Sequence, residues 1–114
     1  MGAVAERLWH WLAAPEHRNL LVLWGEGYTR SLQDASGPWT GFARRTVEDW
    51  LATLATAQSP ERRASPEGAA ERTLLLCVLR GALLDLLATG DRRRTTAAVR
   101  AHLAHAARLP PAPP

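Results

Sequence analysis

One long apolar stretch decides the fold: LLLCVLRGALLDLLA, residues 74–88. Only Arg80 and Asp85 interrupt it, and most of its residues are strong helix formers. A helix with apolar residues on all sides has to be covered on more than one side. The stretch is also shorter than the roughly 20 apolar residues that span a bilayer. It therefore predicts a buried helix and no contact with a membrane.

The rest of the composition also favours helices. Ile is absent and Val and Thr are sparse, whereas Ala, Leu and Arg fill most windows, so we predict an all-α fold. We expect a bundle of five helices, over residues 3–13, 15–33, 38–54, 66–89 and 91–106.

Local signals place the helix boundaries. Ser65-Pro66-Glu67 is typical of a helix start, and Gly90 followed by Asp91 predicts a left-handed terminator and then a cap for the last helix. The polar segment 58–65 predicts a flexible loop. We expect one domain over residues 1–108 and a mobile proline-rich tail over residues 109–114.

Charge and cysteine content argue against two other classes of protein. All basic residues are Arg, the net charge is +3, and the Arg runs at 44–45, 62–63 and 92–94 are well separated. A nucleic-acid-binding face would cluster its basic residues, so we expect no direct DNA binding by this chain. The single cysteine, Cys77, excludes an internal disulfide and agrees with a cytoplasmic location. Its apolar surroundings predict a small core hydrophobe.

The apolar helix over residues 66–89 has more apolar surface than its short neighbours can cover. We therefore predict a homodimer in which two copies of the last two helices form an intersubunit four-helix bundle. Gly81, in mid-helix, indicates close backbone packing, because glycine weakens a helix interior. The alternative is a helix fully buried within a monomer. The predicted interface residues are Leu76, Arg80, Gly81, Leu84, Val99, His102, Leu103 and Ala106.

Residues 79–91, LRGALLDLLATGD, with the Arg-rich helix start after them, resemble the junction of the last two helices in TetR-family transcription regulators. Residues 42–54 and 15–32 are similar to the two preceding helices, and the resemblance extends to about Ala107. It implies a bacterial regulator domain whose last two helices dimerise while the earlier ones enclose an effector. Nothing here resembles the family's N-terminal helix-turn-helix, so the chain would be an excised domain, the product of a truncated gene or a stand-alone sensor.

The aromatic residues lie mostly on the first three helices, which favours a pocket there for a small, mostly apolar effector. Gly25 and Gly27 bracket Glu26 and predict a bend or a close approach in the second helix. Ordinary core packing is the alternative for each aromatic residue. The predicted pocket residues are Trp9, Leu12, Trp24, Tyr28, Phe42, Val47, Trp50 and Leu54.

Enzyme classes find no support in the sequence. It contains no phosphate-binding loop and no nucleophile elbow. His102 and His105 are two possible ligands, too few for a metal site, and Glu48 and Asp49 form a charged surface with the arginines four residues earlier. We therefore expect no enzyme activity, no cofactor and no metal. The alternative to the sensor is a helical protein–protein interaction module, such as a heterodimer partner of a full-length regulator.

Overall fold

The computed structural model describes residues 1–34 and 36–108, which are almost entirely helical and contain no strand. The all-α prediction is confirmed; the predicted mobile tail lies outside the described residues. These residues form six α-helices and one 3-10 turn: α1 (Gly2–Ala13), η1 (Pro15–His17), α2 (Arg18–Gln33), α3 (Phe42–Ala55), α4 (Pro60–Ala64), α5 (Pro66–Thr89) and α6 (Arg92–Arg108).

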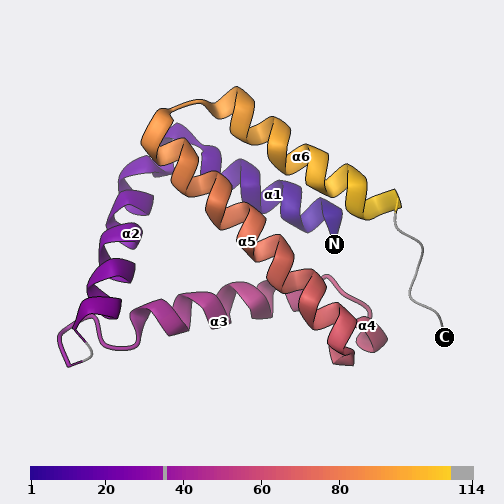
Figure 1. The fold of residues 1–114 in the computed structure, drawn as a ribbon, viewed down its shortest axis with the longest axis horizontal. Coiled ribbons are helices and arrows are strands. Elements are labelled where there is room, and N and C mark those ends of the chain that lie inside the picture. Colours follow the sequence, from indigo (N-terminus) through magenta and orange to yellow (C-terminus); the bar gives the residue numbers. More distant parts are fainter. Residues whose placement is uncertain (35, 109–114) are drawn as a thin grey trace.

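Helix α5 crosses the molecule diagonally (Figure 1). Helices α1 and α6 lie along one side of it, α3 lies on the other, α4 packs beside its N-terminal end, and α2 joins the α1 end to the α3 end. The shortest dimension of the molecule is 18 Å. Because packed helices are about 8–10 Å apart, this thickness holds only about two layers. The single chain therefore leaves part of α5 uncovered.

The core lies where α5 meets α1, α3 and α6. Its members are aliphatic apart from one tryptophan, and each is at most 8% exposed: Ala5, Trp9, Leu12, Ala13, Leu21, Leu54, Leu75, Leu76, Leu79, Leu83 and Val99. Cys77 is exposed, so the prediction of a core cysteine is wrong. Its position on the helix, two residues before Leu79, points it away from the buried leucines. In the described part of the chain, no helix has both the length and the apolarity needed to cross a bilayer.

The predicted boundaries of α5 and the predicted start of α6 are confirmed. The Ser65 hydroxyl accepts a hydrogen bond from the Gly68 N–H at 2.9 Å and caps α5. Gly90 ends α5 in the left-handed conformation with φ 71°, and a carboxylate oxygen of Asp91 accepts from the Arg94 N–H at 3.0 Å at the start of α6. Each of these positions depends on local chemistry alone.

Segment 58–65, expected to be a flexible loop, contains the short helix α4. Ser59 caps this helix, accepting from the Arg62 N–H at 3.2 Å. Gln58 is buried, and its side-chain amide donates to the Gly68 carbonyl at 2.9 Å. An ion pair between Arg62 and Glu71 also ties α4 to α5. The loop prediction is wrong because Ser59-Pro60 is itself a helix start.

Two further boundaries differ from the prediction. Helix α2 is preceded by the 3-10 turn η1 instead of starting at Pro15. Helix α3 starts at Phe42, not near Pro38 or Trp39, because Gly41 adopts a left-handed conformation with φ 76° just before it.

Candidate functional site

A continuous uncharged surface runs along the exposed side of α5. Its members recur every three or four residues, so they lie on one face of the helix. Leu74 and Leu84 are each 55% exposed. At 1.5 Å per residue, this face extends for about 27 Å. We call it the outer stripe of α5; its residues are Ala70, Thr73, Leu74, Cys77, Gly81, Leu84 and Ala88.

Gly81 is the open centre of the outer stripe. A Cβ built at this position would meet nothing within 4 Å. The close backbone packing that the sequence predicts for Gly81 is therefore absent within the described part of the single chain. The glycine leaves a flat place on the surface of α5, where another helix can approach the backbone.

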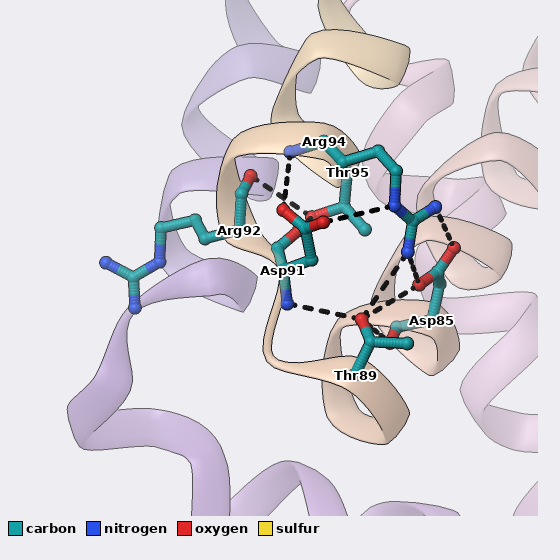
Figure 2. A network of polar contacts seen from close by, with 6 residues as sticks. All are labelled: Asp85, Thr89, Asp91, Arg92, Arg94 and Thr95. Atoms are coloured by element: carbon teal, nitrogen blue, oxygen red, sulfur yellow. Dashed lines mark hydrogen bonds and ion pairs between the residues drawn. The ribbon is translucent and has the colours of Figure 1, made fainter.

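A network of polar contacts holds α6 beside α5 at one edge of the outer stripe (Figure 2). The Arg94 guanidinium donates two hydrogen bonds to the Asp85 carboxylate, one of them 2.8 Å long, and one to Asp91 at 3.3 Å. The Thr89 hydroxyl donates to the Asp85 carboxylate and accepts from the Asp91 N–H at 3.2 Å. The network fixes the turn around Gly90.

The network also determines the charge state of Asp85. The hydrogen bond from Arg94 is the main cause that lowers the pKa of Asp85 below its usual range; desolvation opposes it, and the Thr89 hydroxyl adds to the lowering. In return, Asp85 raises the pKa of Arg94. Both side chains remain charged at neutral pH, so the edge of the outer stripe carries a neutralised ion pair.

The structure divides the predicted interface residues into three groups. Gly81, Leu84 and Ala106 are exposed. Arg80, His102 and Leu103 are half-buried. Leu76 and Val99, each 1% exposed, belong to the monomer core, so their assignment to the interface is wrong. Leu74 and Cys77 were missed, although their spacing from Gly81 and Leu84 places them on the same face.

Four of the predicted pocket residues come together between α2 and α3. The Trp24 ring centroid lies 5.6 Å from that of Tyr28 and 6.3 Å from that of Trp50. Val47 completes the group, and Leu76 and Arg80 of α5 close it. The cavity volume between these side chains is about 0 Å³. The residues are close together as predicted, but they leave no open space.

The other four predicted pocket residues lie elsewhere. Phe42 packs edge-on against Trp39 at 5.2 Å, near Gly27. Leu12 and Leu54 are in the core. Trp9 contacts α6, where its Nε1 donates to the Thr96 hydroxyl at 3.0 Å. The expectation of one pocket lined by all eight residues is therefore wrong, because α1 packs against α5 and α6.

Trp9 instead borders an open groove of about 400 Å³ between α1 and α6. Charged residues of both signs line this groove, among them Glu6, Glu16, Arg92 and Arg100. Arg100 pairs with Glu6 across it at 3.6 Å. Its lining differs from the apolar pocket that the sequence predicts.

The two glycines of α2 behave differently. A Cβ at Gly27 would lie 2.4 Å from the Trp39 ring, so the predicted close approach is confirmed there, whereas Gly25 has nothing within 4 Å. The α-helix continues through both positions. Glu26 is exposed and pairs with Arg30 at 3.1 Å.

The described residues contain no candidate metal site. Over residues 1–34 and 36–108, no three His, Cys, Asp or Glu side chains are grouped closely enough to hold a metal ion. Arg44 and Glu48 form the expected exposed pair at 3.9 Å.

Comparison of this chain with protein-family models, with curated proteins and with solved structures gives no match. The TetR resemblance thus stays a prediction from the sequence.

Proposed function

We propose that this chain is a homodimerisation module that pairs through the outer stripe of α5. The observation that carries the proposal is a charge-free helix face about 27 Å long with two leucines more than half exposed. Exposed apolar surface that is contiguous in this way is typical of protein–protein contacts.

Several features favour a second copy of the chain as the partner. The outer stripe carries no charge, so two copies can face each other without repulsion, although the chain as a whole has a net charge of +3. Gly81 allows the two α5 backbones to approach closely. A two-fold axis through the stripe then presents the same patch on both subunits, as isologous dimers require.

Helix α6 extends the proposed interface. The ion pair of Asp85 and Arg94 turns one side of α6 toward the edge of the outer stripe. Ala98 and Ala101 follow Arg94 on that side, one and two turns along, and both are exposed. Small residues there let a partner helix pack closely. The addition widens the contact toward the roughly 800 Å² per subunit of a stable interface.

The wider role in a transcription regulator is a further proposal that rests on the TetR resemblance. In a regulator of that kind, the dimer would set the spacing of two DNA-reading heads. The predicted effector would have to act on helices that pack against α5, because a ligand shifts a conformation only through differential binding.

Sedimentation equilibrium at micromolar concentration tests the dimer. We expect a particle of twice 12.5 kDa for the natural chain and a monomer for Leu84→Glu, which places a charge in the outer stripe. The control is Leu32→Glu, because Leu32 of α2 is 68% exposed and lies off the stripe. Circular dichroism verifies that each variant is folded. A natural chain that sediments as a monomer, or a Leu84→Glu variant that remains a dimer, overturns the proposal.

Cross-linking tests the placement of the partner. With two antiparallel stripes centred on each other at Gly81, the two Cys77 residues lie about 12 Å apart along the helix axes. Cys77 is the chain's one cysteine, so a flexible bismaleimide should give a single covalent dimer that Leu84→Glu abolishes and Leu32→Glu leaves intact. A dimer without this cross-link contradicts pairing through α5.

A further inference from the structure

A buried N–H without an acceptor and an arginine without a carboxylate partner lie beside the aromatic group of α2 and α3. The closed recess that they border is lined by Trp24, Thr46, Val47, Trp50, Leu76 and Arg80. Most of its wall is apolar or aromatic. The two polar groups that can bind a ligand there, the Trp24 N–H and the Arg80 guanidinium, are both N–H donors, and they set the chemistry that the recess can accept.

The first donor is the indole N–H of Trp24. Its Nε1 atom is fully buried, and no acceptor in the described part of the chain pairs with it. Trp9 provides a contrast, since its Nε1 donates to Thr96 at 3.0 Å. Buried donors are nearly always satisfied in folded proteins, because losing the hydrogen bond with water costs free energy. The N–H of Trp24 is therefore available to a bound acceptor.

The second donor is the guanidinium of Arg80. This side chain is half-buried, and no acidic residue pairs with it over residues 1–34 and 36–108. Its one side-chain hydrogen bond goes to the Tyr28 hydroxyl at 3.4 Å, which is long for such a bond. An arginine that is partly desolvated and lacks a carboxylate retains most of its capacity to bind one.

We propose that this recess binds a small organic monocarboxylate with an aromatic or aliphatic body. The carboxylate would accept from the Arg80 guanidinium and from the Trp24 N–H, and the body would pack among Val47, Trp50 and Leu76. One guanidinium matches one negative charge. A dianion such as phosphate would leave a charge uncompensated among apolar walls, which disfavours it.

The recess has to open for this ligand, since its volume is about 0 Å³. Arg80 lines the recess, is half-buried and makes one side-chain hydrogen bond, at 3.4 Å to Tyr28, so its long side chain can rotate to admit the ligand. Binding therefore includes a rotation of Arg80, and a small acid should bind in the millimolar to micromolar range. The site does not depend on the proposed dimer, because all its residues belong to one chain.

The indole N–H resonances in a ¹H–¹⁵N spectrum report on this site directly. Benzoate is the probe, benzyl alcohol is its uncharged counterpart, and Trp24→Phe assigns the Trp24 resonance. We expect benzoate to shift that resonance saturably and the alcohol to bind at least tenfold more weakly. The proposal is overturned if benzoate produces no saturable shift at concentrations up to about 10 mM, which exceeds the weakest expected dissociation constant. It is also overturned if the two probes bind equally.

Matched arginine variants separate the local contact from general charge. Arg80→Met should weaken benzoate binding at least tenfold, and Arg80→Lys should restore part of it. Arg44→Met removes the same charge from an exposed position on α3 and should change little; equal loss in both variants contradicts the site. Binding measured in Leu84→Glu should match the natural chain, so failure of the dimer and failure of this site give different results.

Discussion

The outer stripe of α5 and the recess at Trp24 are incomplete in opposite ways. The stripe exposes apolar side chains such as Leu74 and Leu84 to water, whereas the recess keeps a polar N–H away from water. Exposed apolar surface is covered best by another extended surface, while a buried donor needs one acceptor atom. Exposed apolar surface therefore indicates a protein as the partner of the stripe, and a buried donor indicates a small acid as the partner of the recess.

The largest expected effect comes from two neighbouring leucines of α5, one buried and one exposed. Leu83 is 0% exposed and Leu84 is 55% exposed. Leu83→Ala should lower the free energy of unfolding by about 2–5 kcal/mol, because it leaves a cavity in the core. In the monomeric state, Leu84→Ala should change it by less than about 0.5 kcal/mol, and its effect should appear in the dimer dissociation constant.

Urea unfolding at several protein concentrations measures both quantities. The effect of Leu83→Ala should not depend on protein concentration, whereas that of Leu84→Ala should. If the effect of Leu84→Ala is the same at all protein concentrations, the outer stripe does not take part in association.

Two glycines give the next largest contrast. Gly27→Ala places a Cβ 2.4 Å from the Trp39 ring and should destabilise the chain by about 1–3 kcal/mol through overpacking. Gly81→Ala meets nothing within 4 Å and should stabilise α5 of the monomer by about 0.5–1 kcal/mol. In the proposed dimer the same methyl group lies in the contact and should weaken association.

Thermal unfolding in the Leu84→Glu background isolates the monomer for this pair. If Gly81→Ala stabilises the monomer and also strengthens the dimer, the backbones of the two α5 helices do not approach at Gly81. A neutral Gly27→Ala would show that Trp39 moves aside freely.

The smallest expected effect is a dependence on pH at the edge of the outer stripe. The pKa of Asp85 is lowered, mainly by its hydrogen bond from Arg94. A lowered pKa gives stability that is present above the unfolded-state pKa and is lost as the pH falls through the folded-state pKa. For an aspartate this window lies below about pH 4. The pair is partly exposed, so solvent screens it and the effect should be small.

Asp85→Asn tests this expectation. The variant should be less stable than the natural chain at pH 6, and the difference should shrink as the pH is lowered to about 2–3, below the usual aspartate pKa. A difference that stays constant between these pH values would show that Asp85 acts through packing and not through its charge.

The sequence predicted those parts of the fold that depend on neighbouring residues. The caps at Ser65 and Asp91 and the left-handed Gly90 each involve a few consecutive residues, so their chemistry is visible locally. The all-α class follows from composition. The helix α4 was missed because the polarity of segment 58–65 outweighed its Ser-Pro start.

The candidate site was predicted less well, for two physical reasons. Helix α5 has apolar residues on all its sides, so its sequence does not show which side faces the core. It does not reveal that Leu76 is buried while Cys77 is exposed. In the sequence, every aromatic residue has the same apolar character, whichever helix it lies on. Only the packing of α1 against α6 separates Trp9 from Trp24. The burial of the Trp24 N–H is a property of the three-dimensional arrangement, with no counterpart in sequence spacing.

The hydrogen bond from Trp9 to Thr96 has a consequence for the synthesis of the chain. The two residues are 87 positions apart, so α1 leaves the ribosome long before its partner helix exists. At about 5–20 residues per second, this interval is roughly 4–17 s. During this time the apolar face of α1 has no α6 to pack against. Until α6 has been synthesised, this apolar face of the nascent chain is available to chaperones.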